Sequence, residues 1–119
     1  GLPQPYQAEA WRSNASLSNL LASLNSAEQL WQGANSDGLR ALLSREQHEL
    51  ANRIDAAYQD SRQQLSALDQ PLSQLLGSDS GRAQLNALYD SLARLHRLHE
   101  SELAKALDIQ LGFNANDGD

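Results

Sequence analysis

Apolar residues recur at helical spacing along most of the chain. In the first segment they fall at offsets of 3, 4, 7, 10 and 14 from Leu17, which places them on one face of a helix. This first stripe consists of Leu17, Leu20, Leu21, Leu24, Ala27 and Trp31. Gly33 ends the pattern, and the sequence GANSDG at residues 33–38 predicts a loop.

A second apolar stripe predicts a helix of roughly 30 residues, a length that is normal in a helical bundle. Asp37 is a plausible N-cap for it, and Pro71 limits its other end. The stripe consists of Leu39, Leu42, Leu43, Leu50, Ile54, Ala57, Leu65 and Leu68, with the small polar Ser61 among them. Glu46 and Arg53 interrupt it, either as ion-pair partners at the bundle edge or as a face that meets another domain.

Two further apolar segments follow Pro71. The first is a short helical turn made by Leu72, Leu75 and Leu76, and the sequence GSDSG at residues 77–81 predicts a second loop. The last helix fades at Asp108. Its stripe consists of Leu85, Leu88, Tyr89, Leu92, Leu95, His96, His99, Leu103 and Leu107.

These patterns predict an all-α fold, an up-and-down helical bundle of about four helices, one of them short. The composition agrees, since the chain has 23 Leu and 17 Ala but no Val or Thr. The 119 residues are enough for one domain, residues 1–119. The final nine residues include two Gly, two Asn, two Asp and the only Phe. We expect them to form a non-helical tail that packs on the bundle, with Phe113 filling an apolar gap.

Charge and composition exclude several classes of function. The net charge of −6 disfavours nucleic acid as a partner, because phosphate binding needs a basic face. The absence of Cys excludes disulfides and thiolate metal sites. No apolar run reaches the length of a membrane span, and no secretory signal is visible in these residues.

Two histidines on the last stripe are the best candidates for a metal site. His96 and His99 both lie on the apolar face, and Glu102 follows His99 by one helical turn. An imidazole and a carboxylate at this spacing can ligate one metal ion in a bundle. The competing interpretation is a hydrogen-bonded histidine that fills the core, and Glu102 falls at the edge of the stripe. His48 lies opposite its own stripe, so we expect it to be solvated.

Other chemistry has little support in the sequence. No Gly-x-Ser-x-Gly elbow, Cys nucleophile or Gly-rich phosphate loop is present. The ending NANDGD offers oxygen ligands but lacks the spacing and distal Glu of a calcium loop. The stretch Trp11–Arg12–Ser13 has two interpretations: an interface anchor, or a capped helix start in which Trp11 packs as a staple. No catalytic or cofactor-binding residue is therefore predicted.

The two ends of the chain carry a resemblance to a known family. The stretch AWRSNASLSNLLASL near the start and LGFNANDGD at the end resemble the C-terminal half of imelysin family proteins. The matching positions are Trp11, Arg12, Ser13, Gly112, Phe113, Asn114, Asp117, Gly118 and Asp119, and the resemblance implies that they are structural or interdomain residues. The family signature Gly-x-His-x-x-Glu belongs to the other half, and Arg97 stands where its Gly would precede His99.

The resemblance implies a larger protein of two helical bundles, of which this chain is the C-terminal domain. Such proteins are exported to the periplasm of Gram-negative bacteria or held on a membrane as lipoproteins. Iron acquisition is the expected role, with this half as scaffold and one wall of an interdomain site. The partners would then be the N-terminal bundle and iron-uptake components. Iron or zinc would be bound by the full-length protein, with no cofactor in this chain alone.

Two other functions remain open at this point. The resemblance also implies a metallopeptidase, because one branch of the family is named for peptidase activity. A third possibility, from a different class, is a non-enzymatic interaction module that uses the face around Glu46 and Arg53.

Overall fold

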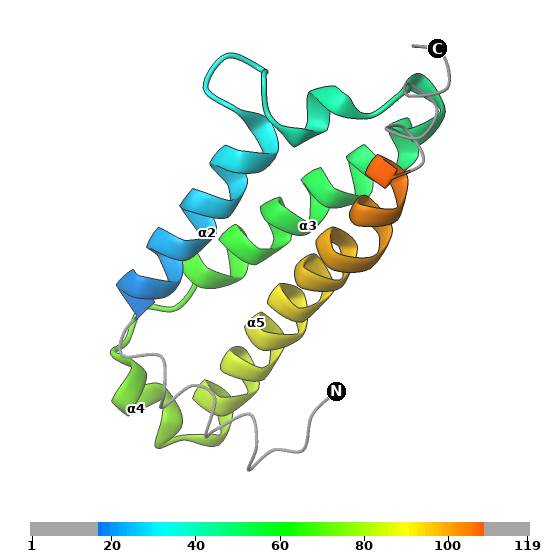
Figure 1. Ribbon diagram of the computed structural model, residues 1–119. Coiled ribbons are helices and arrows are strands. Elements are labelled where there is room, and N and C mark those ends of the chain that lie inside the picture. Colours follow the sequence, from blue (N-terminus) through cyan, green and yellow to red (C-terminus); the bar gives the residue numbers. More distant parts are fainter. Residues whose placement is uncertain (1–16, 109–119) are drawn as a thin grey trace, which may run out of the picture.

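A computed structural model describes residues 17–108 of the chain. Three long helical segments lie side by side, with α3 between α2 and the segment that begins with α5 (Figure 1). The helices are α2 (Leu17–Gln32), α3 (His48–Ser66), the short α4 (Leu72–Leu76) and α5 (Asp79–Arg97). Consecutive long helices run in opposite directions, and no strand occurs between residues 17 and 108. The predicted all-α, up-and-down bundle is confirmed.

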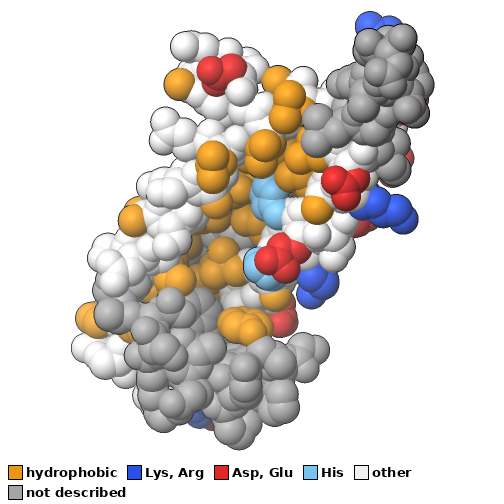
Figure 2. Space-filling view, viewed as in Figure 1, with side chains coloured by type: hydrophobic (Ala, Val, Ile, Leu, Met, Phe, Trp, Pro, Cys, Tyr) orange, Lys and Arg blue, Asp and Glu red, His pale blue; other side chains and the backbone are white. Residues whose placement is uncertain are grey.

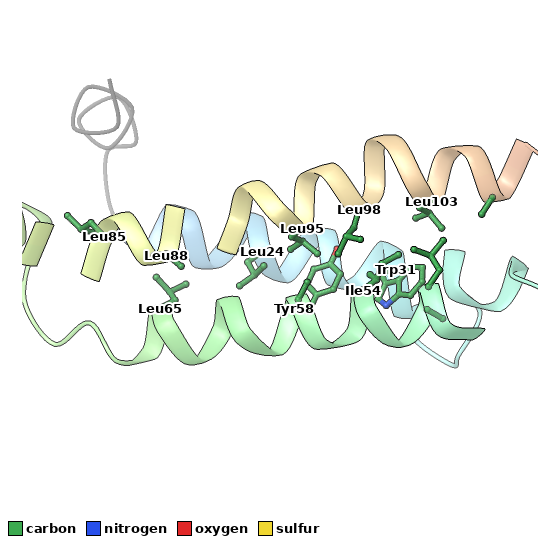
Figure 3. Close-up of a cluster of buried hydrophobic side chains, with 14 of the residues drawn as sticks. Leu24, Trp31, Ile54, Tyr58, Leu65, Leu85, Leu88, Leu95, Leu98 and Leu103 are labelled. Carbon is green, nitrogen blue, oxygen red and sulfur yellow. The ribbon is translucent and has the colours of Figure 1, made fainter. Parts of the chain in front are cut away.

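The core lies mainly between α3 and α5, where labelled side chains from both helices point toward one another (Figure 3). Leu65 and Tyr58 of α3 lie opposite Leu88 and Leu95 of α5, and all four are buried. From α2, Leu24 and Trp31 reach this core, and Trp31 is fully buried. Burial of these large side chains supplies most of the driving force for folding.

A pair of buried serines lies at the contact of α3 with α5. Ser61 is fully buried, and its Oγ lies 2.9 Å from Oγ of Ser91. Ser91 in turn donates to Asp60 Oδ2 at 2.6 Å, so its own oxygen is free to accept from Ser61. The sequence placed Ser61 on the stripe as a tolerated small residue. The structure adds a partner that satisfies its hydroxyl, which makes its burial inexpensive.

The predicted 30-residue second helix is wrong in its first third. Two 3-10 turns, η1 (Leu39–Leu42) and η2 (Arg45–Gln47), precede α3. Ser44 separates them through a capping box: the Gln47 side chain accepts from the Ser44 amide at 2.9 Å. Asp37 is not the N-cap, because its carboxylate accepts instead from the Asn35 amide and Gly38 precedes η1. Local side-chain caps therefore override the apolar periodicity here.

The predicted loops at residues 33–38 and 77–81 have different outcomes. Gly33 ends α2 with a φ of 78°, a conformation that favours glycine, so the first loop is confirmed. The second loop is shorter than predicted, because α5 already begins at Asp79. Ser78 is its N-cap and accepts from the Gly81 amide at 3.0 Å. The tail at residues 109–119 lies outside the described residues, so its packing stays a prediction.

Gly81 allows α4 and α5 to approach closely. A Cβ added at Gly81 would lie 2.2 Å from the carbonyl oxygen of Leu75, which is backbone and cannot move aside. We predict that Gly81→Ala lowers the free energy of unfolding by about 1–3 kcal/mol, as overpacking does elsewhere. Urea unfolding followed by circular dichroism measures this change.

Gly77→Ala is the matched control for Gly81→Ala. Its added Cβ would lie 3.4 Å from its nearest neighbour, the carbonyl oxygen of Gln74, and its φ is −86°. We expect little change in stability from this substitution. Equal losses from the two variants would show that close approach is not the reason for Gly81.

Candidate functional site

An open apolar groove runs between α2 and α5, with α3 as its floor (Figure 2). Its volume is about 410 Å³, within the range of ligand-binding clefts. The apolar side chains that line it are Leu20, Leu24, Ala27, Leu30, Leu39, Leu92 and Leu95. Four polar residues, Ser23, Tyr58, His96 and His99, complete the lining. The groove therefore has few polar groups, and no Asp, Glu, Lys or Arg is among the residues that line it.

The polar floor of this groove is a hydrogen-bonded pair from two helices. Oη of Tyr58, from α3, lies 2.8 Å from Nε2 of His99. The His99 ring also makes edge contacts with the rings of Tyr58 and Trp31, at centroid distances of 5.5 and 5.8 Å. Three aromatic rings from three segments therefore meet at one point, and aromatic pairs in this geometry stabilise a core beyond their buried area.

His99 lies in a π-helical turn, η3 (Leu98–Leu103). The turn continues α5 directly, and residues 104–108 resume the α-helix. Because a π turn places residues i and i+5 together, both Leu98 and Leu103 are buried. In a regular α-helix these two leucines would lie on different faces, so the predicted stripe included Leu103 but not Leu98. Single π turns are frequent at functional sites, which makes this one a further mark of the groove.

Burial changes the pKa of both members of the pair. Desolvation lowers the pKa of His99 below its ordinary value of 6.5, and the nearby His96 lowers it further. Desolvation, with the negative charge of Glu28, raises the pKa of Tyr58 to about 12. At neutral pH the imidazole is therefore neutral and the phenol keeps its proton. A neutral His99 can accept the Tyr58 O–H at Nε2, with its own ring proton on Nδ1.

A second polar network holds Trp31 in place beside His99. The buried indole Nε1–H of Trp31 donates to Asp55 Oδ1 at 2.7 Å. Arg40, from η1, pairs with the same carboxylate at 2.9 Å and also reaches Asn52. The 3-10 segment that replaced the predicted helix therefore supplies the cation that orients the acceptor of Trp31.

The structure gives the three metal candidates separate partners. His99 bonds to Tyr58, whereas the exposed His96 lies 3.2 Å from Glu100. Glu102 pairs with Arg53 of α3 at 3.1 Å, away from the histidines. No group of three or more metal-ligating side chains converges within residues 17–108. His48 is exposed, as the sequence predicted.

The two charges that interrupt the α3 stripe have different surroundings. Arg53 forms its ion pair with Glu102 across the edge of α3 and η3, which agrees with the bundle-edge interpretation for this residue. Glu46 is exposed in η2 and does not belong to the α3 helix face. The two residues therefore do not form one helical surface.

Comparisons with known proteins identify the family. A family model described as Imelysin, peptidase family M75, matches residues 1–99 of the chain. The chain belongs to the imelysin family. Searches of curated proteins and of solved structures found no significant match.

The imelysin match covers only part of the sequence resemblance. It includes Trp11, Arg12 and Ser13 but ends before Gly112. Both end motifs lie outside the residues that the structure describes, so a structural or interdomain role for them stays a prediction. Within residues 17–108 no helix is long and apolar enough to cross a membrane.

Two features of the groove were missed by the sequence analysis. Tyr58 lies four residues after Ile54, on the apolar side of α3, and this spacing could have placed it opposite the last helix. The contact between Asp55 and Trp31 had no such signal, because only the fold brings together these two residues, which are 24 positions apart.

Removal of the Asp55 carboxylate tests the network around Trp31. We predict that Asp55→Ala lowers the free energy of unfolding by about 1–3 kcal/mol, because it leaves a buried N–H without an acceptor. Asp55→Asn keeps an oxygen for Trp31 and loses only a half-exposed ion pair, which costs about 0–1 kcal/mol. Urea unfolding of both variants measures the difference, and equal losses would contradict the role of the indole hydrogen bond.

His99 makes stability depend on pH in a defined direction. Because its pKa is lower in the folded than in the unfolded protein, the unfolded state binds more protons as pH falls below about 6.5. The His99 contribution is therefore fully present above pH 7 and declines as pH falls toward the folded-state pKa. We predict that the free energy of unfolding falls less in His99→Gln than in wild type between pH 7.5 and pH 5.5. These two pH values lie about one unit on each side of the ordinary histidine pKa of 6.5.

Urea unfolding at the two pH values measures this slope, and His48→Gln is the control because His48 is exposed. The His48→Gln slope should match wild type. If His99→Gln also keeps the wild-type slope, His99 is not the titrating group.

Proposed function

We propose that this chain is the C-terminal bundle of an exported imelysin-like protein that serves iron acquisition. In this proposal it acts as scaffold and forms one wall of a site between two bundles. The family match carries the proposal, since it covers 99 of the 119 residues. The periplasm, or a membrane to which a lipid anchor holds the protein, is the proposed location, and iron-uptake components are the proposed partners.

The groove supports a wall rather than a complete metal site. Its lining is apolar, and its two histidines have Tyr58 and Glu100 as partners. Iron and zinc bind to several His, Asp or Glu ligands at once. No group of three or more such side chains converges within residues 17–108, which supports the choice of a wall over a complete metal site. In this proposal the metal ligands come from the other bundle, and α2 and α5 present the apolar side that faces it.

The exposure of leucine side chains on α2 agrees with the idea that another protein unit covers the groove. Leu30 lines the groove and has 69% of its surface exposed, whereas Leu21, 41% exposed, lies outside it. The helix carries only one charged residue, Glu28, which pairs with Arg62 of α3. A helix with so little charge and with exposed leucines is typical of a surface that packs against another protein unit.

A metallopeptidase is the second candidate, because the matching family carries a peptidase designation. In that case this bundle would shape the cleft, and the catalytic metal would again belong to the other half. Cleavage of a protein substrate by the two-bundle protein, abolished by a chelator, would favour this function over iron acquisition.

Calorimetric titration with iron and with zinc tests the proposal. We predict tight binding by the two-bundle protein and none by this chain alone. His99→Ala and Glu102→Gln should leave metal affinity of the two-bundle protein within about twofold, well below the 10–100-fold expected for outer-shell partners of a metal. Tight binding by this chain alone, lost in either variant, would contradict the assignment as scaffold.

A further inference from the structure

The two histidines that line the groove have different surroundings. His99 lies on the floor, where Oη of Tyr58 is 2.8 Å from its Nε2 and the Trp31 ring makes an edge contact. His96 has 67% of its side-chain surface exposed, and its Nε2 lies 3.2 Å from Glu100. Histidine side chains lie against the hydrophobic surface of the groove in Figure 2. A unit that covers the groove would therefore change the surroundings of His99 far more than those of His96.

A positive charge on His99 would have no free carboxylate to pair with on the elements around it. Burial and the neighbouring His96 lower its pKa, whereas a facing carboxylate would raise it. The acidic side chains around the groove floor already have other partners. These pairs are Glu28 of α2 with Arg62 of α3, Asp55 of α3 with Arg40 of η1, Glu100 with His96, and Glu102 with Arg53 of α3.

Covering the groove removes the water that a charged imidazole needs. His99 is only partly buried in this bundle, so water still reaches part of the ring. No Asp, Glu, Lys or Arg is among the described residues that line the groove. A charge without a partner is costly in such surroundings, and the group loses its charge instead. A covered groove therefore accepts a neutral His99 bonded to Tyr58 and disfavours a charged one.

We propose that protonation of His99 opens the contact between this bundle and the unit that covers the groove. The inference rests on the proposed function, in which that unit is the other bundle of the same protein. The open state binds the proton and the covered state does not, so covering weakens as pH falls. The site between the bundles is then closed at neutral pH and open in mild acid.

A single thiol at Leu30 reports whether the groove is covered, because the chain has no Cys of its own. Leu30→Cys is introduced into this chain and into the two-bundle protein, in which any Cys of the other half is replaced by Ser. The ratio of their rates of reaction with 4,4′-dithiodipyridine, the protection, is measured at about pH 7.5 and about pH 5, on either side of the histidine range. We expect protection at neutral pH that falls by about tenfold in acid, the change that one pH unit below the His99 pKa of the open groove produces.

Three variants show which group responds to pH. His99→Gln should keep its protection in acid, because Gln does not titrate and still offers Tyr58 an acceptor. His96→Gln should lose protection as wild type does. Leu42→Cys, an exposed position that does not line the groove, should react equally fast in both proteins at each pH.

A second measurement leaves His99 in place. Because coupling between two equilibria is reciprocal, covering the groove must lower the pKa of His99 if protonation opens it. Titration of the histidine ¹⁵N signals should therefore give a lower pKa for His99 in the two-bundle protein than in this chain alone.

The possible failures of the two proposals are distinguishable. Protection at neutral pH that remains in acid, or that acid removes equally in His99→Gln, would overturn the role of His99 and leave the proposed function intact. Equal pKa values for His99 in the two proteins would do the same. Absence of protection at both pH values would contradict the proposed function and this inference together, because the groove would then be uncovered.

Discussion

The packing of α3 against α5 and η3 is the constraint on which the rest of the structure depends. Polar contacts tie the two sides together at successive levels of this interface. They join Gln47 to the carbonyl of Ala106, Arg53 to Glu102, Tyr58 to His99, and Ser61 to Ser91. Between these levels lie buried leucines. Because polar groups with fixed partners permit only one register, the interface specifies how the helices align as well as stabilising them.

The groove is a consequence of this interface. The two helices form its floor and one side, and α2 joins them through Leu24 and the anchored ring of Trp31. Because α2 packs on α3 and α5 lies across the groove from it, the side between α2 and α5 stays open. This holds for residues 17–108, which the structure describes. His99 lies on this open side, at the start of the π turn. Membership of the imelysin family and an unfilled apolar side are therefore compatible: the open side is where a further segment or bundle can pack.

Periodicity predicted the helices well and their ends poorly. Leucines at helical spacing were sufficient for α2, α4 and most of α3 and α5, because each needs one apolar face. The error at the start of α3 came from Ser44, whose cap competes with the stripe. Only half of the groove floor could be predicted: His99 stood out on its stripe, but its hydrogen bond depends on Tyr58, which is 41 residues away in the sequence. The π turn left no signal except an off-stripe Leu98.

The central claim is that a neutral His99, hydrogen-bonded to Tyr58, forms the polar floor of an apolar groove. The ¹⁵N spectrum of the histidine side chains tests it most directly, with His99→Gln and Tyr58→Phe to assign the signals. At neutral pH we predict that Nε2 of His99 is unprotonated and accepts from Tyr58, whereas Nδ1 carries the proton. In Tyr58→Phe the Nε2 signal should shift toward that of an imidazole nitrogen without a donor. A doubly protonated His99 at neutral pH, or a spectrum that Tyr58→Phe leaves unchanged, would contradict the account.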